Sequence, residues 1–256
     1  MPIALITGAS SGLGAEFARQ LAIRGYDLVL VARDSARLTA LALELADRHG
    51  VRAEALAADL LDPTAGDLVE ARLASTVDPV DYLVNNAGYG LPREFDENSA
   101  DQESRQLELL ATVPLRLSHA ALEQMLPRRS GTVLTVASVA GFAGLGSYSA
   151  AKSWALTFSR WANAYYRSAG VTFTAVAPGF VRTEFHERMG IARESMAPRP
   201  AWLDAARVVR EALRDAERRR AISIPSVRYR LLVGILPALG AVVRAGVARR
   251  GTDRRG

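Results

Sequence analysis

Ile3-Ala4-Leu5-Ile6-Thr7, an unbroken run of strand-forming residues, leads directly into the glycine-rich stretch Gly8-Ala9-Ser10-Ser11-Gly12-Leu13-Gly14. The first run predicts a buried strand, and the pattern of residues 13–24 predicts a helix. A glycine-rich turn between a strand and a helix binds phosphate well, because backbone N–H groups and the helix N-terminus attract anions. The sequence therefore predicts a dinucleotide site at the start of the chain, with contacts from Gly8, Ser10, Ser11, Gly12, Leu13 and Gly14.

The glycine spacing is G-x-x-x-G-x-G, which differs from the more common G-x-G-x-x-G fingerprint. Gly8 would allow a tight turn, Gly12 would let the backbone approach a pyrophosphate, and Gly14 would let the helix pack closely on the strand. The stretch also lacks the Gly-Lys-Ser/Thr of a nucleoside triphosphatase loop. We therefore expect a dinucleotide rather than a nucleoside triphosphate.

Strand-like runs alternate with helical patterns along most of the chain. This alternation predicts an α/β fold, a doubly wound Rossmann-type parallel sheet of about seven strands with helices on both faces. We expect one domain over residues 1–225, followed by a tail over 226–256. The expected strands are Ile3–Thr7, Asp27–Ala32, Arg52–Ala57, Tyr82–Asn85, Thr132–Ala137, Thr172–Ala177 and Ala221–Ile224. The expected helices span 13–24, 34–49, 64–76, 99–127, 148–168 and 202–218.

The composition of the 256 residues excludes several kinds of site. Without cysteine, the chain has no disulfide framework, iron–sulfur site or thiol nucleophile, and three scattered histidines argue against a metal site. The chain begins with strand residues and no basic leader, so we expect a cytoplasmic protein. Of the 32 basic residues 31 are arginine, and Lys152 is the only lysine.

The net charge of +5 is unevenly distributed. Residues 218–256 hold ten arginines and one acid, a net +9, which leaves −4 on residues 1–217 and argues against a nucleic-acid partner. The tail also contains the apolar run 231–243, whose 13 residues fall short of the roughly 20 that span a bilayer. Two interpretations stay open: the tail lies on an anionic membrane surface, or it packs on the domain or on a partner subunit.

The second expected strand ends in Val31-Ala32-Arg33-Asp34. In dinucleotide folds an acid at this point holds the ribose 2′-hydroxyl, whereas an arginine accommodates a 2′-phosphate. Arg33, with Arg37 one turn later, therefore favours NADP(H) over NAD(H), which remains a second candidate.

Tyr148 and Lys152 are four residues apart on an expected helix, so their side chains share a face. A cation beside a phenol favours the phenolate, so we expect Lys152 to lower the pKa of Tyr148 and to make it a general acid–base. Ser138 ends the preceding strand, at the sheet edge where ligands bind, and its hydroxyl could bond a carbonyl oxygen.

Together these residues resemble the classical short-chain dehydrogenase/reductase family over residues 3–224. The matching motifs are the glycine-rich turn, Asn85-Asn86-Ala87-Gly88, Ser138 with Tyr148 and Lys152, and Pro178-Gly179-Phe180-Val181-Arg182-Thr183. The resemblance implies that Tyr148 exchanges the proton at the substrate oxygen, that Lys152 also binds the nicotinamide ribose, and that Ser138 orients the carbonyl. It further implies cofactor contacts from Asp59 and Leu60 beside the adenine, Asn86, Ala87 and Gly88 along the adenosine side, and Pro178, Gly179, Val181 and Thr183 near the nicotinamide and pyrophosphate.

The chain departs from the family pattern at two places. The family commonly has an asparagine on its fourth helix that holds a relay water, and Leu110 stands there. Either the relay uses another route, such as a backbone kink with water, or turnover is slow. Ser138 and Tyr148 are ten positions apart, where thirteen is more usual, which should reshape one wall of the substrate pocket.

We expect the substrate pocket to involve Tyr89, Phe142, Phe185 and Met189, with a mobile lid over about 184–200. These side chains favour an apolar ketone or aldehyde and its alcohol. An NADP-binding sensor or scaffold with little catalysis is the alternative, motivated by Leu110 and the short 139–147 loop. By analogy with the family, we expect a homo-oligomer, a dimer or tetramer.

Overall fold

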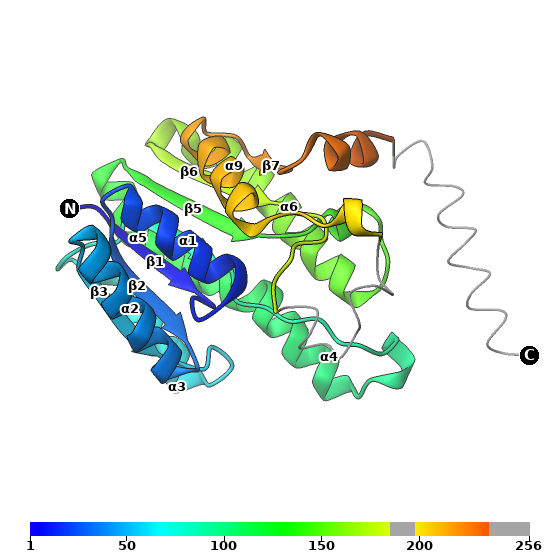
Figure 1. Cartoon of the computed structure of the whole chain (residues 1–256), viewed down its shortest axis with the longest axis horizontal. Coiled ribbons are helices and arrows are strands. Elements are labelled where there is room, and N and C mark those ends of the chain that lie inside the picture. The colour runs from blue at the N-terminus through cyan, green and yellow to red at the C-terminus, as the bar shows by residue number, and fades with distance from the viewer. Residues whose placement is uncertain (185–197, 236–256) are drawn as a thin grey trace, which may run out of the picture.

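Seven parallel strands form one sheet in the order β3-β2-β1-β4-β5-β6-β7 (Figure 1). The computed structural model describes residues 1–184 and 198–235. The strands are β1 Ile3–Thr7, β2 Asp27–Ala32, β3 Ala53–Ala57, β4 Tyr82–Asn85, β5 Gly131–Val136, β6 Val171–Val176 and β7 Ile222–Ser223. All seven expected strands are present, so the predicted doubly wound Rossmann-type fold is confirmed.

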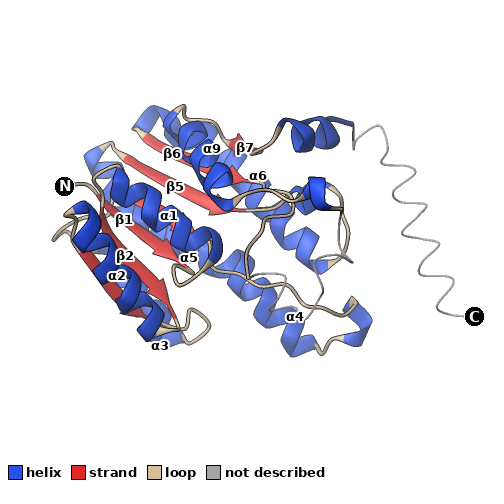
Figure 2. Ribbon diagram, in the orientation of Figure 1, coloured by secondary structure: helices blue, strands red, loops and turns tan. Residues whose placement is uncertain are grey.

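Helices cover both faces of the sheet (Figure 2). Residues of α1, α2 and α9 share one apolar cluster with the strands, and residues of α3, α5 and α6 share the other. The bounds are α1 Gly12–Ile23, α2 Ser35–His49, α3 Pro63–Ala74, α4 Ala100–Leu107, α5 Val113–Arg128, α6 Ser147–Tyr166 and α9 Ala205–Glu217. The first expected strand shows why two layers of helices are needed. Ala4 and Ile6 enter the first cluster while Ile3 and Leu5 enter the second, because successive side chains of a strand point to opposite faces.

The prediction of a single helix over 99–127 is wrong, because the helix is interrupted. A π-helical turn, Glu108–Thr112, separates α4 from α5, and Leu110 lies inside it. Pro114 accounts for the interruption, because proline has no N–H to donate to the carbonyl of Leu110, four residues earlier, and its ring would clash with that carbonyl. The chain therefore has a backbone irregularity at the position where the family commonly has asparagine.

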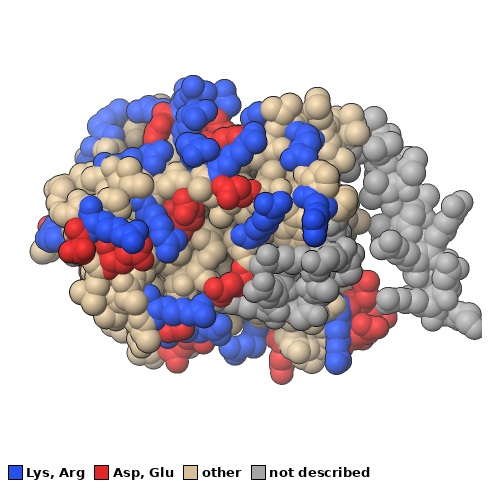
Figure 3. Space-filling view, in the orientation of Figure 1, with Lys and Arg blue, Asp and Glu red and all other residues tan. Residues whose placement is uncertain are grey.

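Arginine supplies the surface cations, and basic and acidic side chains are intermixed over the face shown in Figure 3. Arg52 Nε lies 2.8 Å from Asp27 Oδ2, and Arg128 Nη1 lies 2.6 Å from Asp81 Oδ1. The one lysine behaves differently, since Lys152 is only 6% exposed. The only lysine of the chain is thus buried, whereas arginine supplies the surface cations.

The chain after β7 begins on the domain rather than apart from it. Residues 227–235 form a helix, drawn in dark orange in Figure 1, and both Ser226 and Tyr229 are buried. Tyr229 packs on the domain, as one of the two interpretations of the tail requires, whereas Val227, Leu231 and Ile235 are exposed. The rest of the apolar run, 236–243, lies outside the described residues. Within 1–184 and 198–235, no helix is long and apolar enough to cross a bilayer.

Candidate active site

The glycine-rich turn has the backbone geometry that its residues demand. Gly8 and Gly12 have φ angles of 65° and 56°, in the left-handed region that side chains disfavour. A Cβ at Gly14 would lie 2.1 Å from the carbonyl oxygen of Gly8, so α1 can start this close to the turn only with glycine there. Ser11 is the N-cap of α1, so the N-terminus of this helix lies at the turn. These residues form a cradle that fits a pyrophosphate.

Hydrogen bonds tie this turn to the loop after β4. The backbone N–H groups of Asn86 and Ala87 donate to Thr7 Oγ1 at 2.9 and 3.0 Å. The Asn86 side-chain amide donates to the carbonyls of Thr7 at 2.9 Å and of Gly8 at 3.2 Å. The Asn86 side chain therefore supports the turn itself.

Ser138 lies at the carboxyl edge of the sheet, between the loops that follow β5 and β6. Its hydroxyl accepts a hydrogen bond from the N–H of Ala140 at 3.1 Å, and Val139 N donates to the carbonyl of Pro178 at 3.0 Å. A hydrogen bond joins the side chains of Ser138 and Tyr148. The shortened loop thus still brings the serine to the tyrosine.

Lys152 completes this group from the next turn of α6. Its Nζ lies 5.6 Å from the ring centroid of Tyr148 and donates to the carbonyl of Val136 at 2.7 Å. Burial penalises the charged ammonium and lowers the pKa of Lys152 to about 8.

The expected lowering of the Tyr148 pKa is wrong for this structure. Burial raises that pKa to about 12, and the hydrogen bond with Ser138 only partly opposes the rise. The ammonium of Lys152 is directed to the Val136 carbonyl, and loss of water around the buried phenol sets the direction of the Tyr148 pKa shift. At neutral pH the tyrosine therefore holds its proton.

Leu110 and Gly88 line the space beside the lysine. A Cβ at Gly88 would lie 2.8 Å from Leu110 Cδ2 and 3.9 Å from Lys152 Nζ. Leu110 is 2% exposed and offers no polar side-chain atom to this space. The polar atoms near Gly88 are the main-chain carbonyl oxygen of Asn86 and Lys152 Nζ, each 3.9 Å from the position of such a Cβ.

The expected adenosine-side residues lie near one another. Arg33 is exposed, Leu60 is buried, and Asp59 accepts a hydrogen bond from the N–H of Leu61 at 3.1 Å. Burial raises the pKa of Tyr89, and the charges of Arg33 and Asp59 also act on it. Tyr89, which was expected in the substrate pocket, therefore lies within electrostatic reach of the adenosine-side residues.

Arg37 is paired with Glu184, which follows the 178–183 loop. Its Nη1 lies 3.0 Å from Glu184 Oε2, and this contact raises the pKa of the guanidinium. Thr183, next to Glu184, faces the glycine-rich turn, since its Cβ would lie 3.3 Å from a Cβ at Gly12. The end of the 178–183 loop therefore approaches the turn that would hold the pyrophosphate, which is where Thr183 was expected.

One predicted substrate residue, Phe142, is not brought to this group, and two others lie outside the described residues. Phe142 packs against Ala155 and Leu156 of α6, with the Arg160 guanidinium 5.6 Å from its ring, which places it along the helix beyond Tyr148. Phe185 and Met189 lie outside the described residues, as does most of the expected lid.

Sequence reasoning did not single out Tyr229, whose ring lies directly over Gly179. No motif marks it, because the contact joins residues 50 positions apart in the chain.

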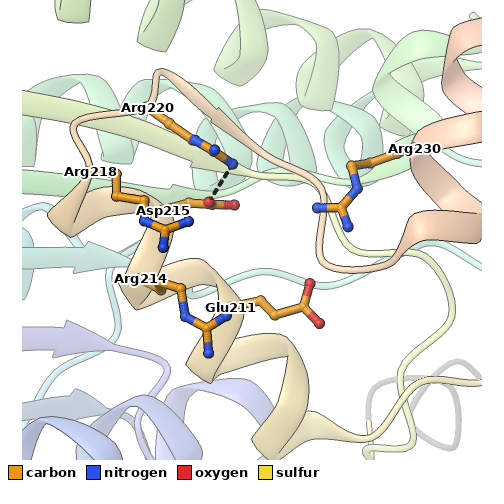
Figure 4. Close-up of a pocket in the computed structure, with 6 residues that line it drawn as sticks. All are labelled: Glu211, Arg214, Asp215, Arg218, Arg220 and Arg230. Carbon is orange, nitrogen blue, oxygen red and sulfur yellow. Dashed lines mark hydrogen bonds and ion pairs between the residues drawn. The ribbon is translucent and has the colours of Figure 1, made fainter.

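A separate hollow of about 260 Å³ lies between α9 and the chain on either side of β7 (Figure 4). None of the predicted site residues lines it. Its one buried acid, Asp215, bonds Arg220 at 2.9 Å and the hydroxyl of Ser223 at 2.8 Å. In the described portion of the chain, no group of three His, Cys, Asp or Glu side chains could hold a metal ion.

Comparisons with known proteins agree with this geometry. The family model described as short chain dehydrogenase matches residues 2–193. The 3-oxoacyl-(acyl-carrier-protein) reductase FabG of Escherichia coli is 32% identical over 185 residues, which are 71% of this chain and 74% of that protein. A short-chain dehydrogenase from Sphingobium yanoikuyae, solved in complex with NADPH, superimposes with a TM-score of 0.85 at 37% identity over 94% of this chain and 96% of its own.

A second solved structure, the bulky-bulky ketone specific alcohol dehydrogenase from Comamonas testosteroni, gives a TM-score of 0.79 at 31% identity over 94% of each chain. The fold is that of NAD(P)-dependent oxidoreductases. The chain belongs to the short-chain dehydrogenase/reductase family.

The burial of Lys152 predicts an unusual titration. Because the chain has one lysine, a protein labelled with ¹³C at the lysine ε-carbon gives a single signal. We expect its titration midpoint near 8 in the folded protein, against 10.5 for an ordinary lysine, and a return to the ordinary value in urea. A folded-state midpoint above 10 would contradict the burial of the ammonium.

Proposed function

We propose that this protein is an NADP(H)-dependent oxidoreductase that transfers hydride between nicotinamide and an apolar ketone or aldehyde and its alcohol. The observation that carries the proposal is the meeting of Ser138, Tyr148 and Lys152 at the carboxyl edge of a doubly wound sheet that begins with a phosphate-binding turn. The neighbour solved with NADPH and the neighbour described as specific for bulky ketones support the cofactor and the substrate class.

We assign a separate role in the reaction to the cofactor and to each catalytic side chain. A bound nicotinamide would supply the hydride. Tyr148 donates its phenolic proton to the carbonyl oxygen during reduction and accepts it in the reverse direction. Its raised pKa keeps this proton in place at neutral pH, and Ser138 donates a hydrogen bond that orients the same oxygen.

Lys152 acts as the compact cation beside the tyrosine and the nicotinamide ribose. An arginine fork would be broader than the single Nζ that fits between the carbonyl of Val136 and the space beside Gly88. Because Leu110 has no polar side chain, the proton relay to Lys152 runs through water held by the backbone, and the π turn at 108–112 is the irregularity that supports this route.

Replacement of Tyr148 tests the mechanism. We expect Tyr148→Phe to lower turnover about 10²- to 10⁴-fold, the usual contribution of general acid–base catalysis, and to leave the dissociation constant of NADPH near normal. A panel of bulky ketones and aldehydes, followed by NADPH absorbance, provides the measurement. Wild-type turnover with an inactive variant would also exclude the sensor or scaffold alternative; undiminished activity in the variant would refute the role of Tyr148.

Replacement of Arg33 tests the cofactor preference. We expect Arg33→Ala to weaken NADPH binding about 10- to 100-fold, since it removes a charge-assisted contact to the 2′-phosphate, and to leave NADH binding unchanged. Arg37→Ala is the matched control, because Arg37 is paired with Glu184, and it should have a smaller effect. Equal losses for NADPH and NADH after Arg33→Ala would argue against the 2′-phosphate assignment.

We also propose that the protein self-associates through α6 and its neighbours. Trp161 and Tyr165 of α6 are 52% and 65% exposed and stack on each other, and Leu115 of α5 is also exposed. Large exposed apolar side chains of this kind mark interaction surfaces. The alternative, that the tail lies on a membrane surface, is supported only by the apolar and basic pattern of the tail sequence.

A charge at the centre of this surface tests self-association. We expect Trp161→Glu to shift the sedimentation coefficient of the protein from a dimer or tetramer toward a monomer, because a carboxylate cannot be buried unpaired in an interface. Val77→Glu, at an exposed loop residue away from α6, is the control and should leave the assembly unchanged. A variant that sediments like the wild type would place the interface elsewhere.

A further inference from the structure

Tyr229 lies beyond residues 2–193, the part of the chain that matches the family model, yet it contacts the predicted cofactor site. It belongs to the helix of residues 227–235 and is only 8% exposed. Its ring packs in an apolar cluster with Val181, Leu203 and Val208, against which Leu13 of the glycine-rich turn also packs. A residue from the C-terminal segment thus shares one cluster with two loops of the cofactor site.

The ring of Tyr229 occupies the space over Gly179. A Cβ at Gly179 would lie 1.9 Å from Cζ of that ring, so only glycine allows the ring to lie this close. The φ angle of Gly179 is not among the left-handed ones, and the requirement for glycine there comes from the tyrosine rather than from the backbone. The two residues therefore form a matched pair.

The hydroxyl of Tyr229 joins two backbone segments. It accepts a hydrogen bond from the N–H of Phe180 at 3.2 Å and donates one to the carbonyl of Ala201 at 2.8 Å. Next to it, the Arg228 guanidinium donates to the carbonyl of Pro200. The helix 227–235 thus holds the chain on both sides of residues 185–197.

Direct bonds join the same two segments. Leu203 N donates to the carbonyl of Phe180 at 2.7 Å, and Arg182 N donates to the carbonyl of Leu203 at 3.0 Å. These bonds fix the register of the two segments, while Tyr229 contacts the 178–183 loop where it leaves β6. The loop ends at Thr183, opposite Gly12, so a shift at Gly179 and Phe180 changes the distance between the loop and the glycine-rich turn.

We infer that Tyr229 is a positioning residue of the cofactor site, which holds the 178–183 loop at the depth that the nicotinamide half of the cofactor requires. The inference rests on the proposed function, in which Val181 and Thr183 contact that half. In this role Tyr229 needs no contact of its own with cofactor or substrate. It acts through the backbone of Gly179 and Phe180, so its loss should affect the nicotinamide half and spare the adenosine half, which binds at Arg33.

Two probes separate these halves. NADPH spans the whole site, whereas 2′,5′-ADP carries the adenosine and the 2′-phosphate without nicotinamide. We expect Tyr229→Phe, which keeps the ring and removes the two hydrogen bonds, to raise the dissociation constant of NADPH about five- to tenfold. The dissociation constant of 2′,5′-ADP should stay within twofold of the wild-type value. Gly179→Ala perturbs the same contact from the loop side and should give the same selective loss.

Tyr82→Phe is the control for removal of a buried phenolic hydroxyl. Within the described residues, Tyr82 Oη is buried and has no hydrogen-bond partner, so its removal should change neither dissociation constant. If Tyr229→Phe weakens the binding of both probes equally, or of neither, the positioning role is overturned. If the Tyr229→Phe variant does not fold, Gly179→Ala is judged by the same criterion. Wild-type protein that binds 2′,5′-ADP and NADPH equally well also overturns the inference, whereas wild-type protein that binds neither overturns the proposed function itself.

Discussion

The predicted cofactor site depends on the hydrogen bonds of the Thr7 hydroxyl, which join β1 to the loop after β4. This hydroxyl accepts hydrogen bonds from two backbone N–H groups of the loop after β4 and lies 3.3 Å from the carbonyl of Val84. Because Thr7 is 1% exposed, its hydroxyl is shielded from water and is satisfied by these protein groups. The glycine-rich turn can therefore keep its left-handed residues in place only while β1 and β4 stay in register.

Burial controls the electrostatics of the Tyr148–Lys152 pair. It raises the pKa of the phenol and lowers that of the ammonium, so both groups shift toward their neutral forms. The two pKa values are about 12 and about 8, which makes the lysine the group that titrates nearer to neutral pH. The main-chain carbonyl of Val136 offsets part of the cost of burying this cation.

The C-terminal segment extends the support of the site beyond residues 2–193, which match the family model. Relatives such as the Escherichia coli reductase align over 71% of this chain, and the family model ends at residue 193. The segment around Tyr229 nevertheless contacts Gly179 and Phe180, which follow β6. The loop motif after β6 is thus contacted by a residue that lies outside the match to the family model.

The sequence by itself determined the strands, the order of helices and the glycine-rich turn, because periodicity and backbone stereochemistry act over a few neighbouring residues. It also placed Tyr148 and Lys152 on one face of a helix, since a spacing of four residues is a local property. Only the tertiary structure decided the direction of the Tyr148 pKa shift, the packing of Phe142 along α6 and the contact of Tyr229 with Gly179. These features depend on water exclusion and on contacts between distant segments, which no local pattern records. The π turn at Leu110 lies between the two cases, because Pro114 indicates an interruption from the sequence alone while the turn also packs against α6.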